Sequence, residues 1–199
     1  KSGKVVSIVK GVYASNTGRY RANETSPYAV ANKLGEDVTY AYGSALSLLT
    51  GRHDVSYRVV FFSRGRGIKL NWIGREYIGY PSPDCMSTRE RRLPGGVTVR
   101  FTDKEQTILD CLSRPDRCGG AEALLRGLSA IAFVDTDRLV DGAISRSKST
   151  VAKLGWLLES NREEWDVPKE ALDKLQQEIA GRGPFYFSRR HEIFDDSWC

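Results

Sequence analysis

Residues 102–115 read TDKEQTILDCLSRP, and this stretch carries the clearest fold signal in the chain. Thr102, with Glu105 three residues later, forms a capping-box pattern that predicts the beginning of a helix. Apolar residues then recur at helical spacing on one face: Ile108, Leu109 and Leu112. Pro115 cannot continue a helix and predicts its end. We therefore expect a helix between Thr102 and Pro115.

The sequence after this stretch has the pattern of successive helices. They are predicted at residues 121–128, 148–160 and 168–180, with one more capped by Asp135 or Thr136. The 148–160 helix has one apolar stripe, formed by Val151, Leu154, Leu157 and Leu158. Gly181 is a typical stop for the last helix.

The sequence before residue 102 begins with a basic, strand-like run. Residues 4–13 predict an edge strand that Gly11 breaks, and residues 14–25 predict a polar linker. A short helix is expected at residues 26–35, because Ser followed by Pro is a good opening and Gly a good stop. A second short helix is expected at residues 43–50, again before a glycine.

Strand-like runs fill much of the remaining first half, at residues 57–62, 68–73, 76–80 and 97–101. Gly65, Gly67 and Gly74 punctuate them and favour hairpins. Strands come first and helices later, without βαβ alternation. The predicted fold class is therefore α+β, with a small mixed or antiparallel sheet and hairpins in the first half and helices in the second.

Charge is distributed unevenly along the 199 residues. Residues 1–100 contain 16 Lys and Arg against 7 Asp and Glu, whereas residues 101–199 contain 14 against 18. A basic half favours an anionic partner such as nucleic acid, although a solvated basic surface explains the same count. The chain does not begin with Met, and we expect residues upstream of Lys1. No apolar run approaches the roughly 18 residues of a membrane span, and no signal-peptide pattern is present. A cytoplasmic protein without a membrane partner is expected.

One pattern resembles a nucleotidyltransferase signature, in which a Gly-Ser turn precedes two carboxylates spaced to bind paired metal ions. Gly43-Ser44 and Asp54 fit it, but Ser56 stands where the second carboxylate is needed. His53 and Asp54 are adjacent, so their side chains tend to point apart, and no nucleophile elbow accompanies them. No catalytic residue is predicted.

Metal-binding side chains are too scattered to predict a metal or cofactor site: Cys85, Cys111, Cys118, Cys199, His53 and His191. A zinc site needs about four closely spaced ligands, and no C-x-x-C pair occurs. Buried or unreactive thiols are the expected state. Cys111 and Cys118 flank a helix end and could pair, but nothing in the sequence requires it. His191 is expected to be solvated in a charged tail.

The most suggestive basic element is residues 63–69, SRGRGIK. It places Arg64, Arg66 and Lys69 around two glycines in a predicted hairpin loop that could approach phosphates closely. Residues 88–92, TRERR, are a weaker case because Glu90 dilutes the charge. A solvated loop remains the alternative for both.

Several segments together resemble the AbiEi family of type IV toxin–antitoxin regulators. The family has a D-x-E-x-T-(L/I)-L-D-x-L-x-R-P run followed by Gly-Gly, similar to residues 102–115 and the Gly119-Gly120 pair. Residues 42–46 (YGSAL) and 153–159 (KLGWLLE) are similar to two further family helices. Residues 3–13 resemble the wing that ends the family's winged helix-turn-helix.

This resemblance implies a division at residue 25. Residues 1–25 would be the wing remnant and linker, and residues 26–199 the antitoxin body. It implies a transcriptional autoregulator that binds operator DNA and antagonises a nucleotidyltransferase-like toxin without a stable complex; it also allows a homodimer. The residues expected to contact nucleic acid are Lys4, Lys10, Arg64, Arg66 and Lys69.

Two other functions remain open. A nucleic-acid-acting enzyme, such as a nuclease or a base-excising protein, would suit the basic half, but it needs carboxylates or a nucleophile gathered in a pocket. A DNA-binding scaffold with no toxin partner would carry the same sequence features.

Overall fold

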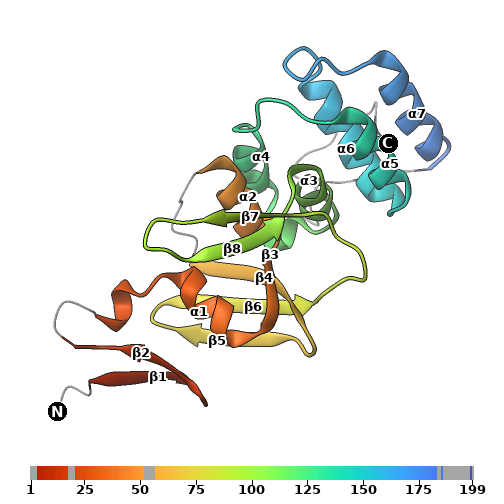
Figure 1. The fold of residues 1–199 in the computed structure, drawn as a ribbon. Helices are drawn as coiled ribbons and strands as arrows, with labels where there is room; N and C mark the ends of the chain where they lie inside the picture. Colours follow the sequence, from red (N-terminus) through yellow and green to blue (C-terminus); the bar gives the residue numbers. More distant parts are fainter. Residues whose placement is uncertain (1–3, 18–20, 52–56, 183–184, 186–197, 199) are drawn as a thin grey trace.

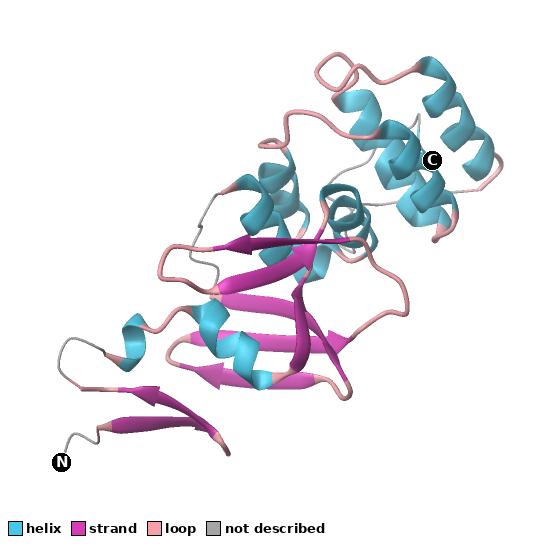
Figure 2. Ribbon diagram, viewed as in Figure 1, coloured by secondary structure: helices cyan, strands magenta, loops and turns pink. Residues whose placement is uncertain are grey.

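The structure is a computed structural model that describes residues 4–17, 21–51, 57–182, 185 and 198 (Figure 1). Strands gather toward the N-terminal end and helices toward the C-terminal end, as Figure 2 shows. The predicted α+β class, with a mixed sheet in the first half and a helical second half, is confirmed.

The main sheet has six strands. In spatial order they are β5 (Ile68–Trp72), β6 (Arg75–Pro81), β4 (Arg58–Arg64), β3 (Glu36–Tyr40), β8 (Thr98–Thr102) and β7 (Thr88–Arg92). The pairs β4–β6 and β3–β8 are parallel, and the other neighbours are antiparallel. β4 is central and buried over most of its length, which agrees with its apolar sequence VVFF.

Of the predicted hairpins, the one at Gly74 is confirmed. Trp72 pairs with Arg75, and the two residues between them, Ile73 and Gly74, both have positive φ (45° and 68°), as a type I′ turn requires. The hairpin predicted at Gly65 and Gly67 is wrong. β4 pairs with β6 and not with β5, so this loop carries the chain past one strand position to the edge of the sheet.

A separate hairpin precedes the main sheet. The single strand predicted over residues 4–13 is wrong, because the chain reverses at Lys10-Gly11 to form β1 (Val5–Val9) and β2 (Val12–Ser15). Gly11 has a φ of 87°, which a residue with a Cβ rarely adopts. The predicted linker thus begins with the end of β2 and includes the short η1 (Ala22–Glu24).

The predicted helices occur within about two residues of their expected bounds. They are α1 (Pro27–Leu34), α2 (Tyr42–Thr50), α3 (Lys104–Ser113), α4 (Ala121–Leu128), α5 (Thr136–Ile144), α6 (Lys148–Ser160) and α7 (Lys169–Ile179), with a short η2 (Pro115–Cys118) after α3. Caps explain two of the starts. Asp135 accepts a hydrogen bond from the Arg138 amide at 3.0 Å, and Ser147 accepts one from the Thr150 amide at 3.3 Å.

The capping box predicted at the start of α3 is displaced by one residue. The N-cap is Asp103, whose Oδ1 accepts a hydrogen bond from the Gln106 amide at 2.9 Å. Thr102 is the last residue of β8, and its buried hydroxyl lies 2.7 Å from that of Thr107. Glu105 does not return to the cap; its carboxylate binds Arg138 of α5 at 3.2 Å. The sequence pattern identified the helix but assigned the wrong partner to its glutamate.

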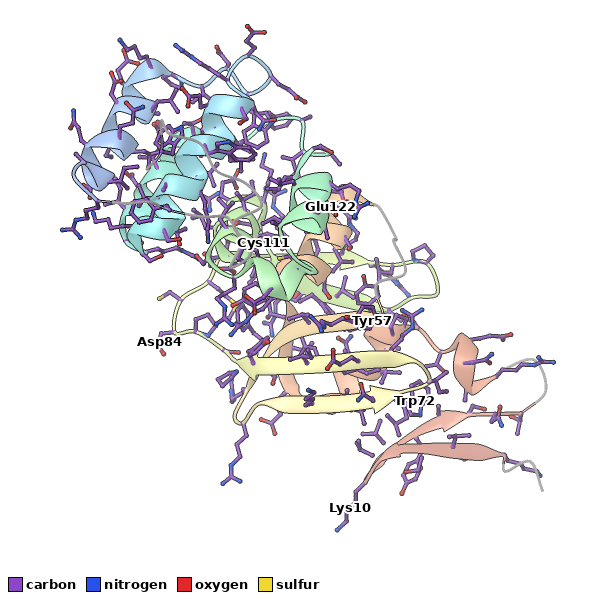
Figure 3. The ribbon with its side chains drawn as sticks, turned by 180° about the vertical axis from the view of Figure 1, so that it is seen from behind. Lys10, Tyr57, Trp72, Asp84, Cys111 and Glu122 are labelled. Carbon is purple, nitrogen blue, oxygen red and sulfur yellow. The ribbon has the colours of Figure 1, made fainter. Side chains whose placement is uncertain are left out.

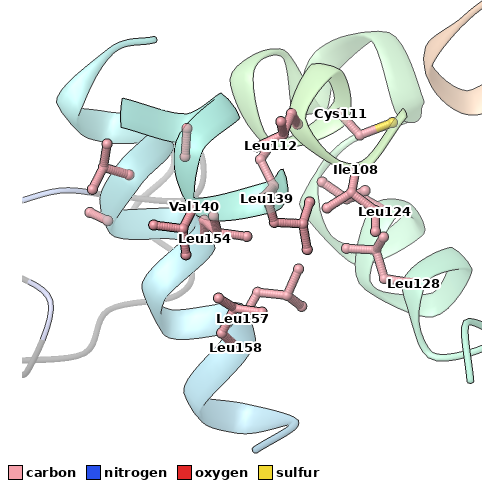
Figure 4. Close-up of a cluster of buried hydrophobic side chains, with 14 of the residues drawn as sticks. Ile108, Cys111, Leu112, Leu124, Leu128, Leu139, Val140, Leu154, Leu157 and Leu158 are labelled. Atoms are coloured by element: carbon pink, nitrogen blue, oxygen red, sulfur yellow. The ribbon is translucent and has the colours of Figure 1, made fainter. Parts of the chain in front are cut away.

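Two apolar clusters stabilise the body. One lies between the sheet and the helices α1 and α2 and includes Tyr40, Phe61 and Val99, with Ile8 of β1 packed against it. The other runs continuously from Phe62 of β4 through α3 to α7, and Figure 4 shows its central part. Because this second cluster joins the sheet to the helices, the two halves of the body fold around shared contacts.

Candidate nucleic-acid interface

The β1–β2 hairpin presents two lysines to solvent. Lys4 precedes β1 and Lys10 occupies the turn, and both are exposed. Figure 3 shows Lys10 at the tip of the hairpin, directed away from the molecule. Two large apolar side chains, Val5 (57% exposed) and Tyr13 (63% exposed), accompany them. An exposed ribbon with cationic and apolar side chains has the composition of a surface that docks on another molecule.

The second predicted group lies where β4 leads into β5. Arg64 ends β4, Arg66 lies in the loop and Lys69 lies in β5. Arg64 Nη2 lies 2.5 Å from Asp37 Oδ2, and Lys69 Nζ lies 3.5 Å from Glu76 Oε1. Arg66 forms no ion pair within the part of the chain that the structure describes. The Arg64 and Lys69 side chains are each 74% exposed, but their partners differ: Asp37 is 52% exposed and Glu76 is 16% exposed. The exposed Arg64–Asp37 pair breaks readily, and a phosphate can replace its carboxylate.

The two groups occupy neighbouring elements. Ile8 of the hairpin packs against the apolar cluster that also holds Ile68 and Leu70 of β5, so the hairpin lies beside the edge of the sheet that carries Lys69 (Figure 1). Ile68 and Leu70 face this cluster, so Lys69 between them points to the opposite face of the sheet, and the structure does not gather the two groups of cations on one face.

Sequence reasoning missed Asp37, the acidic residue among these cations. Its carboxylate contacts Arg64 and also lies 3.8 Å from Arg100 Nη2. Asp37 has a φ of 52°, a conformation that Asp and Asn adopt more readily than most residues. No local sequence signal links it to Arg64, because the contact depends on β3 pairing with β4.

The weaker basic run, residues 88–92, forms the edge strand β7, in which every residue is exposed. Sequence analysis did not predict this strand. Arg91 contacts the rest of the fold. Its Nη1 donates a hydrogen bond to the Leu48 carbonyl at 2.7 Å, and its guanidinium lies 5.8 Å from the Phe101 ring centre. Arg89 and Arg92 remain exposed beside Glu90.

The Gly43-Ser44 pair has a packing role in the first turn of α2. Ser44 is 7% exposed, and its Oγ accepts a hydrogen bond from the Val60 amide at 2.8 Å. A Cβ at Gly43 would lie 3.2 Å from Cys118 Cα, so glycine lets η2 approach closely. The remaining residues of the nucleotidyltransferase-like pattern, Asp54 and Ser56, lie outside the described residues, as do His53 and His191.

A cleft of about 640 Å³ opens where the sheet meets α3 and α5, lined in part by Tyr42, Tyr80, Asp110, Arg117 and Arg146. The Arg117 guanidinium lies 3.6 Å from the Tyr80 ring centre and donates a hydrogen bond to the Tyr42 hydroxyl at 2.6 Å. Tyr42 has a φ of 54°, an unfavourable conformation for an aromatic residue.

Asp110 is the acidic group of this cleft. Its Oδ1 accepts hydrogen bonds from Arg146 Nη2 at 2.8 Å and from Gln106 Nε2 at 2.9 Å, whereas its buried Oδ2 has no partner among the described residues. Burial raises the pKa of Asp110 above its ordinary value, and the charge of Arg146 opposes this shift. The arrangement can hold a proton on a carboxyl group.

Among the described residues, no three His, Cys, Asp or Glu side chains are grouped as metal ligands. Within the same residues, each helix is too short or too polar to span a bilayer. The chain matches no protein-family model and no curated protein.

Proposed function

We propose that this protein is the body of a DNA-binding regulator with antitoxin activity, of the type that its sequence resembles. The observation that carries the proposal is the exposed β1–β2 hairpin, which presents Lys4 and Lys10 to solvent. A two-stranded ribbon of this kind has a shape and charge that suit contact with the backbone of duplex DNA.

Five cations contribute to the proposed DNA surface, and their exposure supports it. Arg66 forms no ion pair within the described residues, Arg64 pairs with the exposed carboxylate of Asp37, and the Lys69 side chain is itself 74% exposed. A cation that neutralises a phosphate releases a condensed counterion, which makes the binding depend strongly on salt. This surface supplies affinity and orientation, and sequence selection would require groups that reach base edges.

The antitoxin activity is proposed for the body, residues 26–199. Its buried side chains join the main sheet and the helices α2 to α7 into one packed unit, which suits a platform that holds other molecules. The protein would antagonise a nucleotidyltransferase-like toxin without chemistry of its own. Ser44 supports this proposal, because its hydroxyl is occupied by a backbone amide.

DNA binding is tested with the double variant Lys4→Ala/Lys10→Ala. The matched control is Lys148→Ala/Lys174→Ala, which removes two lysines from ion pairs on the helical half. Fluorescence anisotropy with a duplex carrying the protein's own promoter should show weakened binding for the hairpin variant and unchanged binding for the control. Equal binding by both variants would refute the role of the hairpin.

Antitoxin activity is tested separately, by co-expression with the gene that neighbours this protein's own. If that gene encodes a toxin, its expression alone should arrest growth, and co-expression of the full-length protein should restore it. DNA binding without rescue of growth would leave a DNA-binding scaffold as the function.

Asp110 favours a second candidate, an enzyme that acts on nucleic acid. A carboxyl group with a raised pKa beside two arginines could serve as a general acid in the 640 Å³ cleft. Purified protein would then cleave DNA or release bases, and Asp110→Asn would abolish this activity while leaving DNA affinity intact. Absence of any turnover that depends on Asp110 would exclude this candidate.

A further inference from the structure

The end of α3 brings two thiols together. Cys111 lies on α3 with no exposed surface, and Cys118 is the last residue of η2 and is half-buried. Both are free thiols, and Cys118 packs against the apolar cluster that contains Cys111. Burial raises the pKa of the Cys111 thiol well above its ordinary value, and the neighbouring Cys118 adds to this shift. Figure 4 shows the Cys111 sulfur on the side of α3 that faces away from α6.

Only Cys118 of this pair reaches an open space. It lines a cavity of about 190 Å³ between α2 and α4. A cavity of this size admits a small peroxide, because a water molecule needs only about 10–15 Å³ by the same kind of measure. Three arginines line the same cavity: Arg58, Arg117 and Arg126. Guanidinium groups stabilise the negative charge that develops on a departing oxygen.

We propose that Cys118 is a site of oxidation by hydroperoxides and that Cys111 resolves the product as an intramolecular disulfide. In the first step the Cys118 sulfur attacks one peroxide oxygen and the O–O bond breaks. The departing hydroxide, or the alkoxide of an organic hydroperoxide, takes the thiol proton and leaves as water or as an alcohol, so Cys118 becomes a sulfenic acid. The peroxide is reduced by two electrons.

In the second step the Cys111 sulfur attacks the sulfur of the sulfenic acid. The S–S bond forms, the S–O bond breaks, and the hydroxide leaves as water with the Cys111 proton. The buried position of Cys111 makes it the resolving group, because peroxide reaches Cys118 from the cavity whereas Cys111 has no exposed surface and does not line that cavity. A thiol such as glutathione or thioredoxin reverses the reaction by exchange.

The disulfide would tie η2 to α3 at a place where the body has little freedom. A Cβ at Gly43 would already lie 3.2 Å from Cys118 Cα, so η2 is tightly packed on α2. Arg117, the residue before Cys118, stacks on Tyr80 in the larger cleft. Drawing the two sulfurs to bonding distance therefore moves the wall of that cleft. The proposal concerns this site alone and does not depend on the proposed DNA-binding function.

The test uses the reduced full-length protein treated with a small excess of hydrogen peroxide. The four thiols counted in denaturant should fall to two, and dithiothreitol should restore four. Trypsin cuts after Lys104, Arg117 and Arg126 but not between Arg114 and Pro115. Mass spectrometry should therefore find peptide 105–117 linked to peptide 118–126.

Three variants assign the roles. Cys118→Ala should prevent the disulfide, and Cys111→Ala should leave a Cys118 sulfenic acid that dimedone traps. Cys85→Ala removes an exposed thiol elsewhere and should behave as the wild type, with its count falling from three to one. The wild-type protein alone can overturn the proposal. It would do so if it kept four thiols after the peroxide treatment, or if its disulfide included Cys85 or Cys199.

Discussion

Asp37 pairs with Arg64, one of the five candidate cations, and also lies near Arg100. Replacing Asp37 with Asn tests whether Arg64 contacts DNA. Arg64 Nη2 is 2.5 Å from Asp37 Oδ2, and Arg100 Nη2 is 3.8 Å from Oδ1. Asn keeps the shape of the side chain and tolerates the φ of 52° at this position. The substitution therefore removes the competing carboxylate and leaves the backbone of β3 in place.

The expected gain in DNA affinity follows from the geometry of the Asp37 contacts. Asp37 contacts Arg64 much more closely than Arg100, so its loss frees about one cation for a phosphate. One added phosphate contact makes the log–log salt slope of DNA binding more negative by about 0.9. Between 1 M and 0.1 M salt this slope corresponds to about an eightfold gain in affinity. Stability should change by less than about 1 kcal/mol, because the pair is exposed to solvent.

The assay is fluorescence anisotropy with duplex DNA at a series of salt concentrations. Glu36→Gln is the matched control, because it removes the same charge from the neighbouring position and none of the described cations pairs with Glu36. Asp37→Asn should steepen the slope more than Glu36→Gln does. Identical slopes for the two variants would refute the idea that Arg64 contacts phosphate.

Two further predictions concern the helical half. Arg138→Gln removes the ion pairs with Asp103 and Glu105 and should destabilise the protein by about 1–2 kcal/mol at pH 7. This loss is smaller than for a fully buried ion pair, because the Arg138 side chain is 48% exposed. Burial alone would raise the pKa of Asp103, but hydrogen bonds, chiefly from Arg138, hold it below its ordinary value. The contribution of Asp103 to the free energy of unfolding is therefore complete above the ordinary carboxyl pKa and is lost as the pH falls through the lowered pKa. In urea unfolding, the stabilities of the wild type and of Arg138→Gln should converge in acid. A stability difference that stays constant with pH would contradict this. Gly155→Ala would place a Cβ 1.9 Å from the ring of Trp198, which is 2% exposed, and should destabilise the protein by about 1–3 kcal/mol. In a Trp198→Ala background the same change should be nearly neutral in thermal unfolding, and an equal loss in both backgrounds would argue against the contact.

Helix positions could be predicted from the sequence because their signals are local. The glycine after α2 has a φ of 66°, and Asp135 and Ser147 accept the amide hydrogen bonds that cap α5 and α6. Each of these signals acts within one turn of the chain, so a single sequence contains it in full.

Strand pairing could not be predicted to the same degree. β7 reads TRERR and has no apolar residue, so the alternation that marks a half-buried strand is absent. It is a strand because β8 supplies the backbone partners. The parallel pairing of β4 with β6 likewise depends on contacts across the whole sheet, and the local glycines suggested a hairpin in its place.

In the candidate site, too, local features could be predicted from the sequence and contacts between strands could not. The sequence identified Lys4, Lys10, Arg64, Arg66 and Lys69 as candidate cations, and all five are exposed. It could not identify the carboxylates of Asp37 and Glu76 that pair with two of them, because those contacts cross between strands. The cleft around Asp110 could not be predicted either, because residues from six separate segments of the sequence line it.

The salt dependence of DNA binding by Arg64→Ala/Arg66→Ala/Lys69→Ala tests the central claim most directly. Because Asp37 occupies Arg64 in the wild type, Arg66 and Lys69 are the two cations expected to neutralise phosphates, and the slope of log K against log salt concentration should be less negative than that of the wild type by about 1.8. A triple variant with the slope of the wild type would contradict the claim that this surface holds nucleic acid.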